Sequence, residues 1–312
     1  MDVLGRHCLL HRHPRRGHRA GCAVPAQRHR RSICQARTRF RQRARQGGRK
    51  TGRRRRGRSQ VSTSTQPLTQ KPDAAVDPIL VVRGLHKHFG GIKAADGVDL
   101  EVGRCEIAGL IGPNGSGKST LFSLVSGTVA PDKGEVRFDG RDIAGQNAYK
   151  VARLGLARTF QIPALFDNMT VTENLLAAAA EGHWPGAHER AAETLALLKL
   201  EHVADNRASD LSGGQQKLLE FGRVIMRQAS LILLDEVTAG VHPNIRKIIL
   251  EAIAKLRERG VSFLIIEHDM EMVRSVCDRI IVMDSGRVVT SGPFEEIVRN
   301  SEVMKTYLGR PQ

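Results

Sequence analysis

The chain has 312 residues, and the 40% that are hydrophobic are enough to form a buried core. Its net charge of +17 is concentrated at one end, because residues 1–60 hold 20 of the 49 Lys and Arg but only one of the 32 Asp and Glu. The other residues carry 29 basic and 31 acidic side chains, which argues against a nucleic-acid-binding surface on that part. No apolar run reaches the roughly 18 to 20 residues that span a bilayer, and no Cys-x-x-Cys pair indicates a zinc site.

Residues 1–60 are rich in Arg, His, Gly and Gln and show no sustained hydrophobic period. We expect a disordered extension that, with a polar linker, occupies residues 1–77, before a folded domain at 78–312. Three origins for the extension remain open. It can be an arginine-rich arm that binds RNA, DNA or anionic lipid, an organellar transit peptide, or a stretch upstream of a true start near Val61.

The first expected strands flank a glycine turn. Residues 79–82 are apolar, and after Gly90-Gly91 the residues from 98 to 102 alternate between apolar and polar side chains, which indicates a half-buried antiparallel strand. Residues 107–111 form a short apolar run that suits a buried parallel strand. Phe89, just before the turn, is either part of the core or a surface on which a base stacks.

A phosphate-binding loop follows the strand at 107–111. The pattern G-x-x-x-x-G-K-[ST] is formed by Gly112, Pro113, Asn114, Gly115, Ser116, Gly117, Lys118, Ser119 and Thr120. Apolar residues at helical spacing come next, so the loop lies where a strand turns into a helix, and backbone N–H groups can surround an anion. We expect Lys118 to hold the β- and γ-phosphates of a nucleotide and the Ser119 hydroxyl to bind Mg²⁺.

The remainder alternates between short apolar strands and longer helices. Strands are expected at 135–140, 157–160, 231–234, 261–266 and 280–283, with helices at 170–181, 188–200, from Gly213 onward and at 243–259, and a short helix before the last strand. Strands that alternate with helices predict a mainly parallel α/β sheet covered on both faces, and the helices between about 162 and 228 form an insertion.

Polar residues follow the later strands. Asp235 and Glu236 end an apolar strand, where we expect Asp235 to support Mg²⁺ and Glu236 to orient or deprotonate the attacking water. His268 follows the next strand and is placed to donate to the γ-phosphate. A second glycine-rich helix start, Leu211-Ser212-Gly213-Gly214-Gln215, predicts another anion site, which suggests that two chains share nucleotides.

The order of phosphate loop, glutamine, Leu-Ser-Gly-Gly-Gln, Asp-Glu and histidine resembles an ABC-type ATPase domain over residues 79–309. The resemblance implies a P-loop NTPase core of ABC type with an antiparallel β subdomain and the helical insertion. Three stretches, at 157–161, 165–175 and 239–243, and the ending at 307–309 are similar to the ATP-binding subunits of branched-chain amino acid importers and of their urea and amide relatives. Two residues depart from the pattern: Val237 stands where the ABC family usually has proline, and Val241 stands where this branch usually has leucine. The helical insertion is also shorter than in typical branched-chain importer subunits.

The resemblance also implies residue roles. Phe89 would stack on adenine, and Gln161 would contact Mg²⁺. Ser212, Gly213, Gly214 and Gln215 would clamp the ATP held by a second ATPase subunit, identical or sister. Glu236 would be the catalytic base, with Asp235 supporting Mg²⁺ and His268 contacting the γ-phosphate.

The implied partners are two transmembrane permease subunits, one of them received by residues 162–175, and indirectly an extracytoplasmic solute-binding protein. The domain would work at the cytoplasmic face of the membrane, with no nucleic-acid partner. Two alternatives stay open: an ABC ATPase of another system, such as an exporter or a soluble DNA-repair or translation factor, and nucleic-acid binding through the basic extension.

Overall fold

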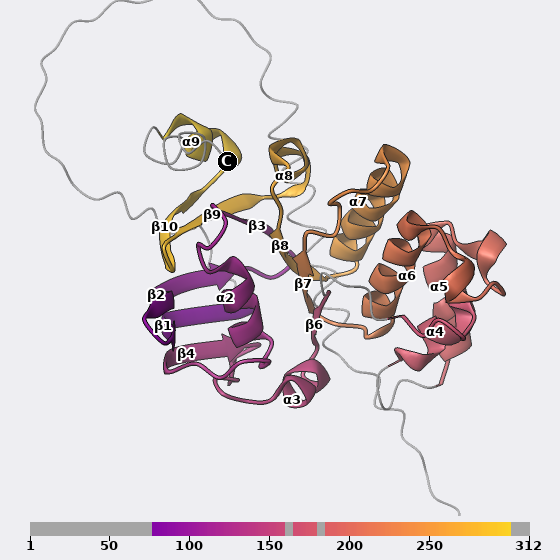
Figure 1. Cartoon of the computed structure of the whole chain (residues 1–312), viewed down its shortest axis with the longest axis horizontal. Coiled ribbons are helices and arrows are strands. Elements are labelled where there is room, and N and C mark those ends of the chain that lie inside the picture. Colours follow the sequence, from indigo (N-terminus) through magenta and orange to yellow (C-terminus); the bar gives the residue numbers. More distant parts are fainter. Residues whose placement is uncertain (1–76, 160–164, 180–184, 301–312) are drawn as a thin grey trace, which may run out of the picture.

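The computed structural model describes residues 77–159, 165–179 and 185–300, so the expectations for residues 1–76 lie outside the described residues. Two sheets organise this part of the chain (Figure 1). The smaller is antiparallel, with strand order β2-β1-β4-β5. Its strands are β1 (Leu80–Phe89), β2 (Ile92–Val102), β4 (Lys133–Phe138) and β5 (Arg141–Asp142).

The larger sheet is mainly parallel and has the strand order β10-β9-β3-β8-β7-β6. Its strands are β3 (Ile107–Ile111), β6 (Leu156–Arg158), β7 (Leu231–Asp235), β8 (Ser262–Ile266), β9 (Arg279–Asp284) and β10 (Arg287–Gly292). Only the β9–β10 pair is antiparallel among the described strands of this sheet. The carboxyl ends of β3, β6, β7 and β8 therefore meet at one edge, where ligands bind in open α/β sheets.

Alternate residues of the parallel strands face two different cores. Leu110, Leu231 and Leu264 pack with α2 (Lys118–Val125) and the antiparallel sheet. Ile232 and Phe263, on the opposite face, pack with helices that include α7 (Pro243–Glu258). The prediction of a sheet covered on both faces is confirmed, and one of the two covers is largely the antiparallel sheet.

The described residues between β6 and β7 are largely helical. They include α4 (Val171–Ala177), α5 (Ala187–Leu198) and α6 (Gly213–Met226), with one-turn 3₁₀ helices at 201–203 and 208–210. α4 begins with a capping box in which Thr170 and Glu173 each accept the other's backbone N–H. Figure 1 shows this group to one side of the sheets, joined to them through α7.

Three further helices complete the described chain: α3 (Ala148–Arg153), α8 (Met270–Val276) and α9 (Phe294–Arg299). None of the helices in the described ranges is both long and apolar enough to cross a bilayer.

Gly222 on α6 sets how closely α4 and α5 approach. A Cβ at this position would lie 2.9 Å from Leu175 Cδ2 and 3.0 Å from Leu198 Cδ1. We therefore expect Gly222→Leu to overpack the helical core and lower the free energy of unfolding by about 1–3 kcal/mol, measured as a shift of the urea midpoint. Gly91→Ala is the control, because a Cβ there meets nothing within 4 Å. Equal midpoints for the two variants would contradict this account of the packing.

Candidate functional site

The phosphate-binding loop joins the end of β3 to the start of α2. Gly117, the N-cap of α2, has φ +99°, and a Cβ there would lie 2.2 Å from the carbonyl oxygen of Ala94. Only glycine fits this position. No side chain caps α2, so the first backbone N–H groups of the helix are directed at the loop, where they can receive an anion.

Lys118 folds back over the loop that precedes it. Its Nζ donates to the carbonyl oxygens of Gly112 and Pro113, both at 2.9 Å, and the side chain is nearly buried. Burial lowers the pKa of the Lys118 ammonium, while the carboxylates of Glu236 and Asp235 oppose that change. The loop therefore holds the charged Lys118 ammonium against two carbonyl oxygens. From there the ammonium can turn toward a bound phosphate.

Asp235 is a buried acid at the carboxyl end of β7. Its Oδ2 lies 3.3 Å from a guanidinium nitrogen of Arg158, and its N–H donates to Thr159 Oγ1 at 3.0 Å. The other carboxylate oxygen, Oδ1, is buried and accepts no hydrogen bond from the described part of the chain. Burial raises the pKa of this carboxyl, and Arg158 opposes the rise. An acid oxygen left in this state fits a ligand of Mg²⁺ or of its water.

Arg158 connects three elements around that acid. From the end of β6 it donates to Asp235 on β7 and, at 3.1 Å, to the hydroxyl of Ser123 on α2, and it lies over the ring of Phe122. The sequence had not indicated this role. The available signal was an arginine inside a short strand that the pattern made part of a buried sheet.

Glu236 and His268 are brought together by the ends of β7 and β8. Glu236 has φ +49°, a backbone conformation that non-glycine residues rarely adopt, and its N–H donates to the carbonyl oxygen of Ile266 at 3.0 Å. Its Oε1 lies 2.9 Å from His268 Nε2. Both side chains are partly exposed, so the pair is accessible from the edge of the sheet that holds the phosphate loop.

Glu267 is a second buried acid, for which no role was predicted. It is 3% exposed, and its Oε1 accepts from both the N–H and the hydroxyl of Thr238, at 3.0 and 2.8 Å. Burial raises the pKa of the Glu267 carboxyl, and the two hydrogen bonds oppose that rise. This contact fixes the turn after Glu236 to the turn that carries His268.

The other predicted residues lie apart from this group or outside the described ranges. Phe89, at the end of β1, is 48% exposed, with Lys87 Nζ 5.5 Å from its ring centroid. Ser212 and Gln215 form a capping box at the start of α6, in the helical group that Figure 1 shows well to one side of α2. Gln161 lies outside the described residues.

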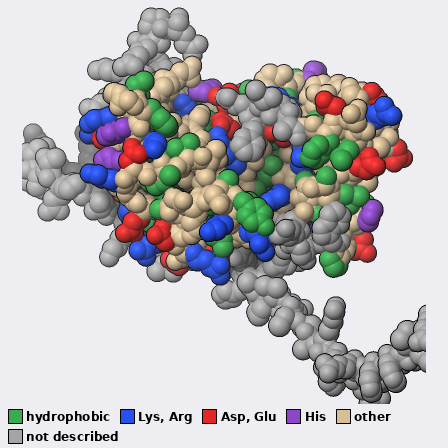
Figure 2. Space-filling model, turned by 60° about the horizontal axis from the view of Figure 1, so that its bottom comes forward, with side chains coloured by type: hydrophobic (Ala, Val, Ile, Leu, Met, Phe, Trp, Pro, Cys, Tyr) green, Lys and Arg blue, Asp and Glu red, His purple; other side chains and the backbone are tan. Residues whose placement is uncertain are grey.

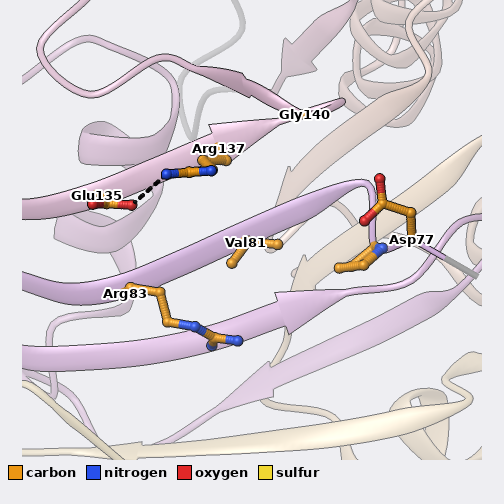
Figure 3. Close-up of a pocket in the computed structure, with 7 residues that line it drawn as sticks. Asp77, Val81, Arg83, Glu135, Arg137 and Gly140 are labelled. Carbon is orange, nitrogen blue, oxygen red and sulfur yellow. Dashed lines mark hydrogen bonds and ion pairs between the residues drawn. The ribbon is translucent and has the colours of Figure 1, made fainter. Parts of the chain in front are cut away.

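One hollow in the described part of the chain lies away from the phosphate loop. It has a volume of about 400 Å³ and lies on the antiparallel sheet, lined by Asp77, Pro78, Val81, Arg83, Glu135, Arg137 and Gly140. Figure 3 shows Glu135 and Arg137 paired side by side along β4, with Val81 and Arg83 on the neighbouring strand β1. These side chains converge on no buried polar group, and we assign the hollow no role.

Thr238→Val tests the contact with Glu267. Losing one donor raises the pKa of the buried carboxyl further, so we expect the free energy of unfolding to fall by about 1–3 kcal/mol at neutral pH. The folded-state pKa lies above the unfolded one, so the folded protein binds more protons between the two values and stability falls as the pH rises through that window. The loss should therefore shrink in acid. Urea midpoints at neutral and at acidic pH measure the loss of stability. Thr238→Ser, which keeps the hydroxyl donor, is the control. A loss independent of pH would contradict the proposed link to Glu267.

Comparisons with known proteins place these features in a family. The family model described as "ABC transporter" matches residues 95–239. The probable branched-chain amino acid transport ATP-binding protein LivG of Archaeoglobus fulgidus is 42% identical over 245 residues, covering 74% of this chain and 95% of that protein. The high-affinity branched-chain amino acid transport ATP-binding protein BraF of Pseudomonas aeruginosa is 40% identical over 250 residues, covering 74% and 98%.

Solved structures agree with that placement. An ATP-binding cassette of an ABC transporter in its ADP conformation is 34% identical, with a TM-score of 0.68 and coverage of 75% of this chain and 100% of that one. A dimeric ATP-binding cassette in a post-hydrolysis state, bound to ADP and Pi, is 26% identical, with a TM-score of 0.61 and coverage of 69% and 98%. The fold is therefore the ABC-type P-loop NTPase fold, and the chain belongs to the family of ABC transporter ATP-binding proteins.

Proposed function

We propose that this protein is the ATP-hydrolysing subunit of an importer of branched-chain amino acids or a related small polar solute. The observation that carries the proposal is the grouping of Lys118, Asp235 and the Glu236–His268 pair at one sheet edge, beside a loop built to bind phosphate. The names of the similar proteins from Archaeoglobus fulgidus and Pseudomonas aeruginosa support the solute class.

Residues of the loop and of β1 would hold the nucleotide. Phe89 offers an exposed ring for stacking on adenine, and the loop at 112–120 offers backbone N–H groups to the phosphates. Lys118 would exchange its two carbonyl partners for the β- and γ-phosphates, which are stronger acceptors for an ammonium.

The residues present fit a magnesium ion. Ser119 lies in the first turn of α2. Asp235 Oδ1, which accepts no hydrogen bond from the described residues, supplies the kind of hard, anionic oxygen that Mg²⁺ prefers. Gln161 would provide a further ligand. When bound there, Mg²⁺ supplies charge neutralisation on the β- and γ-phosphate oxygens. Arg158 holds the Asp235 carboxylate in one orientation through Oδ2 and so keeps Oδ1 available.

Hydrolysis would depend on positioning by Glu236 and His268. The Glu236 carboxylate would orient the attacking water and accept its proton. His268 Nε2 would turn from Glu236 to donate to the γ-phosphate. The left-handed backbone at Glu236 and the Thr238–Glu267 contact hold this turn, so that the base is placed before the nucleotide binds.

The helix start at Ser212–Gln215 would act on a second ATPase subunit. It lies in the helical group, apart from the phosphate loop of the same chain (Figure 1). It would contact the ATP held by a partner, and the dimeric cassette with ADP and Pi supports such an arrangement. Two permease subunits would receive the resulting movement, with a solute-binding protein outside the membrane and this subunit peripheral at the cytoplasmic face.

Glu236→Gln tests the catalytic base. The amide keeps the size of the side chain but cannot accept a proton, so we expect kcat for ATP to fall about 10²- to 10⁴-fold while nucleotide affinity stays within about threefold. Phosphate release and equilibrium nucleotide binding measure the two quantities. Glu271→Gln, at an exposed acid on α8, is the matched control and should leave kcat unchanged. Near-normal turnover in Glu236→Gln would remove Glu236 as the base.

Purification of the full-length Glu236→Gln variant with Mg-ATP from native membranes tests the proposed partners. We expect two polytopic membrane proteins and an ATPase subunit to be recovered with it, because slow hydrolysis favours the closed assembly. Their recovery should fall when ATP is replaced by ADP. Recovery of ribosomes or nucleic acid instead would contradict the transport function and leave the ATPase activity standing.

A further inference from the structure

Two histidines and an aspartate gather on the antiparallel sheet, away from the catalytic acids. His86 and His88 are alternate residues of β1, and Asp96 lies opposite His86 on β2. One possible ligand atom from each of the three side chains lies within 4.8 Å of the others. Among the described residues, this is the one cluster of three or more His, Cys, Asp or Glu with that spacing.

The geometry of the cluster suits a first-row transition metal. His86 Nδ1 lies 3.5 Å from Asp96 Oδ1. Ligand atoms about 2.0–2.1 Å from a tetrahedral zinc ion are about 3.3 Å apart, so these two atoms are already at the required spacing. His88 is exposed, so its ring has room to turn inward, and a water molecule would complete four ligands.

Asp96 is oriented as a metal ligand would be. Arg287 donates from Nε and a terminal nitrogen to Oδ2, at 3.1 and 2.6 Å, and Lys93 Nζ lies 3.7 Å from the same oxygen. Oδ1 is left directed at His86. A partner on the outer oxygen is the usual way in which proteins fix a ligating carboxylate. The three side chains include only one carboxylate, which disfavours Mg²⁺ and Ca²⁺ because these ions depend on several anionic oxygens. Imidazole nitrogens favour zinc, nickel or copper instead.

The backbone around the cluster is held independently of any metal. Asp132 accepts from the N–H of His88 at 2.7 Å and from Lys87 Nζ at 2.8 Å, which fixes the end of β1 and pairs the nearest lysine. Figure 2 shows histidine side chains gathered with acidic and basic ones on the left-hand lobe, the side on which Figure 1 places β1 and β2.

We propose that His86, His88 and Asp96 form a binding site for a divalent transition-metal ion of the zinc class, separate from the proposed magnesium site. The site adjoins the nucleotide-binding elements. Phe89 directly follows His88, and the Asp96 N–H donates to the carbonyl oxygen of Gly286, whose own N–H donates to Ser116 in the phosphate loop, at 2.9 and 3.0 Å. A bound ion would tie β1 to β2 at the place where the loop rests on the sheet.

Histidine footprinting of the full chain tests this site residue by residue. The protein is titrated with Zn²⁺ in excess Mg²⁺ without nucleotide, treated with diethylpyrocarbonate at neutral pH, and modification is read by mass spectrometry. His86 and His88 should become protected together, with one midpoint, and EDTA should reverse the protection. His202, exposed in the helical group, is the internal control and should stay reactive. Because each histidine is read separately, zinc bound by the histidines of residues 1–76 does not enter the result.

Two variants distinguish zinc bound by all three side chains from zinc bound by a single surface histidine. In His86→Gln, His88 is retained but should lose its protection. In Asp96→Asn, which keeps the size of the side chain and an acceptor for Arg287, the protection midpoint should rise at least about tenfold. Neither side chain is fully buried, and circular dichroism confirms folding. Unprotected His86 and His88 at saturating Zn²⁺, or unaltered protection of His88 in either variant, would overturn the proposal.

Discussion

The buried carboxylate of Asp235 is the constraint on which the nucleotide edge depends. An ionised group in the interior is costly unless it is paired, and here a single guanidinium supplies the pairing. From the end of β6, the terminal nitrogens of Arg158 donate to Ser123 of α2 and to Asp235 of β7. One ion pair therefore fixes the loop helix and two strands relative to one another. The other carboxylate oxygen of Asp235, Oδ1, is left for a ligand, so the same side chain contributes to stability and to the proposed function.

Strand topology brings the remaining groups to that ion pair. Because β3, β7 and β8 run parallel as neighbours, the residues that follow each strand emerge at one edge although they are far apart in sequence. Two local devices then refine their placement. The positive φ of Glu236 turns its side chain toward His268, and the buried Glu267 anchors the following turn through Thr238. Such backbone strain persists only where surrounding contacts determine it, as these do.

Much of the parallel core could be predicted from the sequence, because short apolar runs and helical periodicity are local signals. The loop, Asp235, Glu236 and His268 were predicted from local signals of the same kind. β10 was missed, although the dipeptide Ser285-Gly286 between β9 and β10 is typical of a hairpin turn. Both residues have positive φ, +48° and +77°. β1 extends well beyond the predicted residues 79–82. Its polar half is held by pairing with β2, and this pairing contains bulges. The local hydrophobic pattern does not indicate such pairing. Arg158 and Glu267 were missed because their roles arise only where distant strands meet.

Gly213 and Gly214, at the start of α6, differ in whether contacts within their own chain require glycine. At Gly214 a Cβ would lie 3.0 Å from Ile245 Cγ1, so packing against α7 favours a small residue there. At Gly213 a Cβ would meet nothing within 4 Å, and φ is not positive, so neither sterics nor backbone conformation within the described chain demands glycine. The capping box satisfies the Gln215 N–H and leaves earlier N–H groups of the helix without intrahelical partners. A bare, positively polarised surface of this kind is useful only if something approaches the backbone closely from outside. The proposed nucleotide of a second subunit meets that requirement, since phosphate oxygens need both the space and the donors that Gly213 leaves open.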